Sequence, residues 1–289
     1  LKDIYHIVAW ARDAVHLIEK VHIQDPGLYN SFGTVRSSSL SIVGHNGDLD
    51  FYHGTLRARD DKGDTIFDGI DYQHYDQYID EEVKAWSYMK FPFIRTLGKE
   101  RGWYKVGPLA RVQNCDQIPT PFAEQERKAF VDYAGGMPMH APLAYHWTRM
   151  IEMLHAAEVI NDLLHDDDLL IIDLMVEGER QREGVGVIEA PRGTLFHHYR
   201  VDDNDLVTMC NLIVSTTNNN QAMNEAVRQV ARRYLNGREV TEGLLNHIEV
   251  AIRAFDPCLS CATHALGKMP LEVELIDPDG TQVHTLSKS

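Results

Sequence analysis

The stretch Asp256-Pro257-Cys258-Leu259-Ser260-Cys261-Ala262-Thr263-His264 carries the strongest structural signal in this sequence. Because a proline just past a predicted helix end cannot continue the helix, both cysteines are expected on a turn. A spacing of two residues lets the two sulfurs converge on one metal, as in many zinc and iron–sulfur sites. His264 follows three residues later and can approach the same centre. The stretch therefore predicts a metal site on a turn that follows a helix.

The other two cysteines, Cys115 and Cys210, are isolated in the sequence. Neither has a partner at metal-ligand spacing, so both are interpreted as small core residues. Four cysteines in 289 residues are too few for a disulfide-stapled secreted domain. A bare Cys-x-x-Cys favours half of a structural zinc site, but zinc wants four closed ligands, and no second Cys-x-x-Cys is present to supply them.

Outward from this stretch, the sequence predicts both helices and antiparallel strands. Apolar side chains recur at helical spacing, or cap signals frame a helix, at residues 1–22, 121–134, 143–164, 221–235 and 241–255. Strand patterns occur at residues 39–43, 49–59, 65–67, 185–190, 194–201 and 206–215, and a hairpin pattern at 271–276 and 281–284. Because regular βαβ alternation is absent, the predicted fold class is α+β.

Two segments have weaker patterns. Residues 72–90 mix acids with aromatic side chains and are interpreted as a helix that ends at Phe91-Pro92-Phe93. Residues 104–111 have turn-forming residues at their centre and are interpreted as a loop. The acidic run at 166–168 and the pair His197-His198 are interpreted as a solvated loop and a strand face, without chemistry.

The charge balance is strongly acidic: 28 Lys and Arg against 43 Asp and Glu give a net charge of −15. Such a surface repels phosphate backbones, so nucleic acid is excluded as a partner. No apolar run approaches the roughly 18 to 20 residues that span a bilayer. The amino end has no targeting pattern and no initiating Met, and it reads like the middle of a helix. We therefore expect the chain to be a fragment of a larger subunit.

The stretch at 256–264 matches Asp-Pro-Cys-x-x-Cys-x-x-His, and it resembles the carboxy-terminal metal motif of nickel–iron hydrogenase large subunits. Glu189-Ala190-Pro191-Arg192-Gly193-Thr194-Leu195 is similar to that family's arginine-bearing segment, and Ser215-Thr216-Thr217-Asn218 to its hydroxyl-bearing segment. Residues 104–111 and 196–199 resemble the soluble bidirectional NAD-linked branch. The resemblance spans essentially the whole chain. It implies long helices around a buried metal site, with small antiparallel sheets.

The resemblance also implies a ligand set for a nickel–iron centre. Cys258 would be a terminal nickel thiolate, and Cys261 would bridge nickel and iron, as suits soft metals. Cys258 would also accept the proton, because only one metal withdraws electron density from its sulfur. His264 would bind a magnesium ion near the carboxy terminus, although a lone histidine is commonly structural.

Three further residues are implied to lie around the centre. Arg192, with Pro191 beside it, would hold a guanidinium over the open metal position and stay cationic. The plain alternative for Arg192 is a salt bridge to Glu189. Ser215 would donate a hydrogen bond to a diatomic ligand on iron, and its plain alternative is a strand-end turn.

The implied reaction is the reversible heterolytic cleavage of dihydrogen, with a metal as Lewis acid and a nearby base taking the proton. In the resembled family the iron carries carbon monoxide and cyanide. Electrons leave through iron–sulfur clusters of a separate small subunit, and in the NAD-linked branch they continue to NAD through diaphorase-type subunits. The resemblance thus implies a cytoplasmic enzyme, although deazaflavin-linked and polysulfide-linked relatives leave the electron acceptor open.

The sequence departs from the family at its amino-terminal side. The family's other cysteine pair, in an Arg-x-Cys-Gly-x-Cys motif, is missing, because no cysteine precedes Cys115. We therefore expect residues 1–264 to be the carboxy-terminal portion of a large subunit, inactive in isolation. Residues 265–289 would be the extension that a maturation protease removes, unless they form a permanent hairpin.

Two other classes of protein stay open from the sequence. One is a metal-free relative in respiratory complex I, which shares the fold and binds quinone. The presence of Cys258, Cys261, Arg192 and His264 together argues against it, because a metal-free scaffold has no use for paired thiolates. The other is a zinc-stabilised interaction module, which elemental analysis would distinguish.

Overall fold

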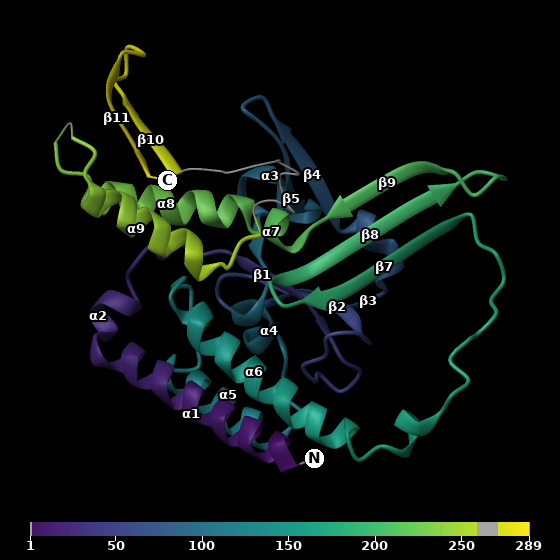
Figure 1. The fold of residues 1–289 in the computed structure, drawn as a ribbon. Helices are drawn as coiled ribbons and strands as arrows, with labels where there is room; N and C mark the ends of the chain where they lie inside the picture. The colour runs from purple at the N-terminus through teal and green to yellow at the C-terminus, as the bar shows by residue number, and fades with distance from the viewer. Residues whose placement is uncertain (1, 238, 259–270, 289) are drawn as a thin grey trace.

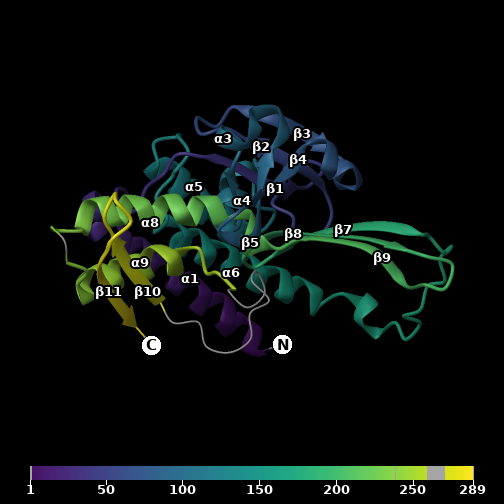
Figure 2. The same ribbon diagram turned by 90° about the horizontal axis from the view of Figure 1, so that it is seen from above.

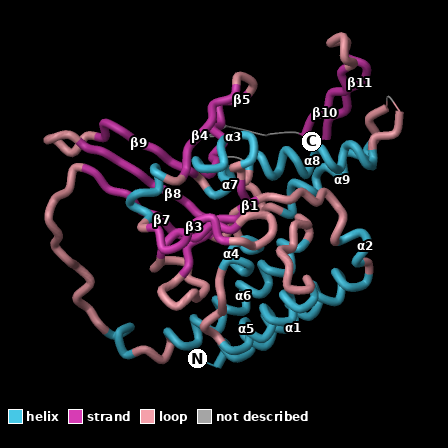
Figure 3. The backbone as a smooth tube through the Cα atoms, turned by 180° about the vertical axis from the view of Figure 1, so that it is seen from behind, coloured by secondary structure: helices cyan, strands magenta, loops and turns pink. Residues whose placement is uncertain are grey.

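The computed structural model describes residues 2–237, 239–258 and 271–288. Helices and strands occupy different parts of the molecule, as Figure 3 shows, and the predicted α+β class is confirmed. Three helices form one layer: α1 (Lys2–Gln24), α5 (Pro121–Tyr133) and α6 (Ala144–Leu163). In Figure 1, α1 runs alongside α6 with α5 behind them. Each of the three predicted helices in this layer is confirmed.

The apolar stripe of α6 explains why this layer holds together. Trp147, Ile151 and Leu154 recur at helical spacing and are fully buried against α1 and α5. Phe130 of α5 meets the Trp147 ring edge-on, with 5.3 Å between ring centroids. Burial of large side chains like these contributes roughly 1.5–3 kcal/mol each, which makes this cluster the base on which the sheets rest.

A mixed sheet covers the helical layer, with strand order β3-β2-β1-β6. Its strands are β1 (Ser38–Val43), β2 (Thr55–Arg59), β3 (Thr65–Ile70) and β6 (Tyr104–Lys105). The first three pair antiparallel, whereas β6 pairs parallel to β1. The prediction of a strand over 49–59 is only partly right. The Asp50 carboxylate accepts hydrogen bonds from the amides of Tyr52 and His53, and this turn keeps residues 49–54 out of the strand.

The prediction of a helix over 72–90 is wrong. A short 3-10 helix, η1 (Tyr72–Gln77), is followed by the hairpin β4 (Ile79–Lys84) and β5 (Ser87–Ile94). Pro92 pairs with Glu81 inside this hairpin rather than ending a helix, which a two-stranded sheet tolerates because each strand has an unpaired edge. Two short turns follow, η2 (Arg95–Leu97) and α3 (Gly98–Arg101).

The prediction of a loop over 104–111 is also wrong. Tyr104 and Lys105 form β6, and α4 (Pro108–Asn114) follows after a single turn. Gly107 takes φ +96°, and Pro108 occupies the first turn of the helix, where its missing N–H is not needed. The Gly-Pro pair therefore marks a helix start. It sends α4 beneath the mixed sheet, as Figure 2 shows.

A long antiparallel sheet projects away from the helices in Figures 1 and 2. It consists of β7 (Glu183–Ala190), β8 (Gly193–Val201) and β9 (Val207–Ile213), in that order. The predicted strands at 185–190 and 194–201 are confirmed, and β9 ends two residues before Ser215. The link from α6 to β7 contains one turn, η3 (Asp167–Leu170), and is exposed throughout residues 162–184.

Four elements complete the chain: α7 (Ser215–Asn218), α8 (Asn220–Tyr234), α9 (Glu242–Ala254) and the hairpin β10 (Leu271–Ile276) with β11 (Gln282–Lys288). A four-residue helix, α2 (Pro26–Tyr29), lies near this end. The predicted hairpin is confirmed. Its apolar side chains pack beside the core of α8 and α9, and His284 Nδ1 accepts a hydrogen bond from the Val240 amide at 2.9 Å. None of the described helices is long and apolar enough to cross a bilayer.

Candidate metal centre

The two-residue turn Pro191-Arg192 joins β7 to β8. Ala190 and Gly193 pair across its base, so the turn projects from the end of the hairpin. Gly193 has φ +136°, and a Cβ there would lie 2.3 Å from Val106 Cγ2. Only glycine fits this position, because both the backbone conformation and the space exclude a side chain. The tight approach fixes the turn against β6.

Arg192 extends from this turn towards the end of α9. Its Nε donates to the main-chain oxygen of Asp256 at 2.8 Å and lies 3.5 Å from Asp256 Oδ2. Both side chains are about two-fifths exposed, at 41% and 42%. The alternative salt bridge from Arg192 to Glu189 is not formed. The printed contacts of the guanidinium with the described residues are thus made through Nε.

Asp256 turns the chain sharply after α9. It takes φ +53°, a left-handed conformation that Asp and Asn tolerate better than most other residues. The Cys258 amide then donates to Thr216 Oγ1 at 3.1 Å. Cys258 is thereby placed beside α7, on the turn that the proline signal predicts. The other two predicted metal ligands, Cys261 and His264, lie outside the described residues.

Ser215 begins α7 and meets the same junction. Its hydroxyl donates to the Gly193 main-chain oxygen at 2.6 Å. Asn218 donates to Thr194 O at 2.8 Å and accepts from the buried Tyr104 hydroxyl at 2.6 Å. These bonds tie α7 to β8 and β6. Three segments far apart in the sequence, at 191–193, 215–218 and 256–258, thus converge at one place.

A buried network of ion pairs supports the turn at Pro191-Arg192. Arg111 of α4 is 1% exposed, and Glu152 of α6 accepts two hydrogen bonds from it, at 2.7 and 2.6 Å. A third bond runs from Arg111 to Glu189 at 2.8 Å. The same guanidinium donates to the main-chain oxygens of Ala190 at 2.8 Å and Pro191 at 3.3 Å. Arg111 thus donates hydrogen bonds to the main chain of the two residues that directly precede Arg192.

Burial and neighbouring charges both shift the pKa values of the residues in this network. Burial alone would lower the pKa of Arg111, but the carboxylates of Glu152 and Glu189 outweigh it and raise that pKa. Burial raises the pKa of Glu152 despite the attraction of Arg111. Glu189 Oε1 also accepts from the Ile42 amide at 2.8 Å and the Thr194 hydroxyl at 2.7 Å. Every donor and acceptor around the buried cation therefore has a partner.

Sequence reasoning missed Arg111 and Glu152. Glu152 lies about 100° around α6 from Ile151 and outside the apolar stripe, so its position in the sequence does not signal that it is buried. The interpretation of Cys115 as a core residue is confirmed, since it is 3% exposed and burial raises its thiol pKa to about 12. The same interpretation is wrong for Cys210, which is exposed on β9.

The family of this chain follows from comparison with known proteins. A family model described as nickel-dependent hydrogenase matches residues 41–264, which include the turn, α7 and the segment after α9. The chain belongs to this family. It is 45% identical over 284 residues to the NAD-reducing hydrogenase HoxS subunit beta of Cupriavidus necator, covering 97% of this chain and 58% of that relative.

Solved structures agree with this assignment. A crystal structure of an NAD+-reducing NiFe hydrogenase in the H2-reduced state matches with a TM-score of 0.87 and 50% identity, over 91% of this chain and 58% of that one. A variant of the NiFeSe hydrogenase from Desulfovibrio vulgaris Hildenborough shares the fold, with a TM-score of 0.64 at 19% identity over 90% of this chain and 59% of that one. The chain thus spans somewhat more than half the length of the relatives it matches.

Proposed function

We propose that this chain is the carboxy-terminal portion of the large, catalytic subunit of a nickel–iron hydrogenase. The intact subunit would oxidise dihydrogen reversibly to protons and electrons. The observation that carries the proposal is the convergence of Arg192, Ser215 and Cys258 from three remote segments. Each of these residues lies in a segment that the family resemblance singled out, and the hydrogen bonds bring the segments together.

The donor chemistry at this place suits such a centre. Cys258 is disulfide-bonded in this structure; once reduced to the thiolate it would offer a soft sulfur ligand, and Cys261 would supply the second thiolate. When bound, the nickel–iron centre, with carbon monoxide and cyanide on iron, would supply the Lewis acid and the redox change. The Cys258 sulfur would take the proton released from dihydrogen. His264 would hold a magnesium ion.

Arg192 would orient dihydrogen over the open position. Its Nε is committed to the Asp256 main chain, so the two terminal nitrogens keep their N–H groups for the site. Such a cation stays charged at any pH relevant to the protein. Ser215, which donates to Gly193 O in this structure, would turn its hydroxyl to a diatomic ligand on iron, with Pro191 packed beside that ligand.

The electron path would lie on partner subunits. We infer a small subunit with iron–sulfur clusters, diaphorase-type subunits and NAD as acceptor, since the relative from Cupriavidus necator is named as NAD-reducing. The complex would be cytoplasmic. Residues 265–289 would be removed by a maturation protease. Mass spectrometry of the active enzyme from its natural host tests this last point, because an end at Ser289 contradicts it.

Elemental analysis with infrared spectroscopy tests the proposed function. The intact subunit, purified with its partners, should contain nickel and iron at one each, beyond the iron of the partners' clusters. It should also absorb in the region of metal-bound carbon monoxide and cyanide. Replacing Cys258 and Cys261 together by serine should abolish both the nickel and these bands. Zinc alone, or hydrogen turnover by the double variant, would contradict the proposal.

A further inference from the structure

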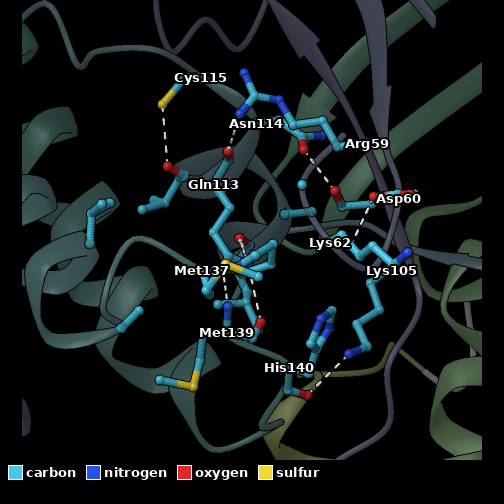
Figure 4. A pocket seen from close by; sticks show the side chains of 18 of the residues that line it. Arg59, Asp60, Lys62, Lys105, Gln113, Asn114, Cys115, Met137, Met139 and His140 are labelled. Carbon is cyan, nitrogen blue, oxygen red and sulfur yellow. Dashed lines mark hydrogen bonds between the residues drawn. The ribbon is translucent and has the colours of Figure 1, made fainter. Parts of the chain in front are cut away.

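A cavity of about 380 Å³ opens beside the mixed sheet. Its lining residues lie between positions 37 and 140 of the sequence and do not include the turn at 191–192. Figure 4 shows it from close by, with Lys105 and Arg59 on one side and Met137 and Met139 on the other. The volume lies within the roughly 300–1,000 Å³ of small-molecule sites. α4 and the segment at 134–140 close the cavity around the sheet.

The polar wall of the cavity is a row of side chains across three strands. Ser39 of β1 pairs with Arg59 of β2 on one side and with Lys105 of β6 on the other. Residues that pair in register point to the same face of a sheet, and residues two apart on one strand do so as well. Ser37 therefore faces the same space, and all four line the cavity.

Lys105 is the unusual member of this row. It is 5% exposed, and its ammonium donates to the main-chain oxygens of Val35 at 2.7 Å and His140 at 3.0 Å. An ammonium has three N–H groups, so one is left for the cavity. No carboxylate of the described residues lies within ion-pair distance of Lys105, and burial lowers its pKa to about 7. Buried lysines are usually paired, because an isolated charge is costly to desolvate.

Two other donors on this wall also lack partners. The Ser37 hydroxyl and the Arg59 Nε are buried, and neither has a hydrogen-bond partner in the described parts of the chain. The Arg59 terminal nitrogens, by contrast, are occupied by Asp116 at 3.0 Å and by the Gln113 main chain at 3.4 Å. Three donors with unmatched hydrogens therefore belong to residues that line one cavity.

The acidic side chains of the lining do not accept hydrogen bonds from these three donors. Asp116 is bound to Arg57 and Arg59, and the Asp60 carboxylate accepts from the amides of Lys62 and Asp64 in its own turn. The third acid of the lining, Asp64, forms no ion pair with Lys105 or Arg59. Another part of the lining is apolar. Its side chains are Leu109, Val131, Met137 and Met139. A ligand that fits both walls carries an oxyanion head and a compact apolar body.

We propose that this cavity binds a small organic anion, whose carboxylate or phosphate head accepts hydrogen bonds from Lys105, Ser37 and Arg59. Its apolar body lies against Met137 and Met139. A bound oxyanion supplies the counter-charge that Lys105 lacks and fills the unmatched donors. The site stands on its own geometry, so it holds whether or not the hydrogenase function is correct.

Calorimetric titration of the purified protein at constant ionic strength tests the proposal. The probes are acetate, hexanoate, hexyl phosphate and the neutral hexanamide. Hexanoate or hexyl phosphate should bind with one site per chain, and the tighter of the two identifies the head group. Acetate should bind at least about ten-fold more weakly, because it lacks four methylene groups to bury. Hexanamide should not compete.

Variants locate the binding. Lys105→Met should weaken the tighter probe by at least about ten-fold, because a hydrogen bond to a charged group is lost. Lys128→Met is the matched control: its side chain is 69% exposed and lies outside the cavity lining, so binding should not change. Ser37→Ala should weaken binding several-fold, and it is safe for folding because this hydroxyl has no partner. Equal binding by all variants, or no saturable binding of either anion, would overturn the proposal.

Discussion

The position of the Arg192 side chain is set by a contact with a segment that is remote in the sequence. Its Nε binds the Asp256 main chain, which leaves the flat guanidinium facing the end of α9. A lysine at this position would keep the charge but not the planar arrangement of donors. The role proposed for Arg192 would therefore depend on the shape of its side chain as well as on its charge.

We expect Arg192→Lys to lower hydrogen turnover of the intact enzyme by about 10²-fold or more, the loss typical of removing one preorganised donor. Nickel content and thermal stability should stay close to those of the parent, because both side chains are exposed at this pair. Hydrogen-dependent dye reduction measures the first quantity. An active Arg192→Lys enzyme would remove Arg192 from the mechanism.

Lys105 should make stability depend on pH in a defined window. Its pKa is about 7 in the folded chain and about 10.4 when unfolded, so the unfolded state binds more protons between these values. The free energy of unfolding should therefore rise with pH, by up to about 1.4 kcal/mol per unit. The neighbouring His140 does not interfere, because burial and the Lys105 charge lower its pKa to about 4.

Urea unfolding of the parent and of Lys105→Met at pH 7, 8 and 9 checks this. The parent should gain stability relative to the variant as the pH rises, and the comparison cancels groups common to both proteins. A constant difference across the three pH values would show that Lys105 titrates normally.

The residues proposed to form the metal centre and the residues that support them differ in how well the sequence predicts them. Cys258 and Arg192 belong to short motifs, and those motifs are local. Arg111 and Glu152 are 41 residues apart, and their pairing depends on how α4 and α6 pack. No local pattern in the sequence encodes that packing.

At the scale of elements, Arg111 joins α4, α6 and β7 into one unit. We expect Arg111→Met to lower the free energy of unfolding by about 3–5 kcal/mol, because Glu152 and Glu189 stay buried without their cation. Arg228→Met is the control: it pairs with Glu225 within α8, and its own side chain is half exposed, so the loss should be below about 1 kcal/mol. Equal losses, measured by denaturant unfolding, would contradict the role of the network.

Elements with one clear periodicity were predicted well, and those with mixed signals were not. The stripes of α1 and α6 gave correct helices, whereas the hairpin at 79–94 was mistaken for a helix because its acids and aromatics have no single apolar face. α4 was mistaken for a loop, since Gly107 and Pro108 resemble a turn when they are not recognised as a helix start. The pairing of β6 with β1 is long-range and lies beyond any local pattern.

At the scale of the molecule, the link from α6 to β7 is the part with the least support. Residues 171–181 have no regular structure and are exposed along their whole length, including the apolar side chains of Ile171, Ile172 and Val176. Exposed segments of this kind are preferred sites of proteolytic cleavage. The helices and sheets on either side are held together by buried contacts that do not involve the link.

Brief digestion with thermolysin, which cuts before large apolar residues, should therefore cleave first within 169–176. The two pieces should stay together on gel filtration, because Arg111 on one side of the cut donates to Glu189 and to the main-chain oxygens of Ala190 and Pro191 on the other. Mass spectrometry identifies the cut. Primary cleavage within α8 or α9, or separation of the pieces in native buffer, would contradict this view.

The grip of Arg111 on Ala190 and Pro191 has a consequence for protein engineering. A designer who transplants the hairpin tip with its arginine into another scaffold transfers the sequence but not the support. The transplanted loop would also need a buried cation like Arg111 and two acids that pair with it. It would need a glycine like Gly193 as well, packed closely enough to fix the turn. Reconstruction of the site in a smaller scaffold thus has a minimum size, set by the distance between α4 and α6 rather than by the length of the loop.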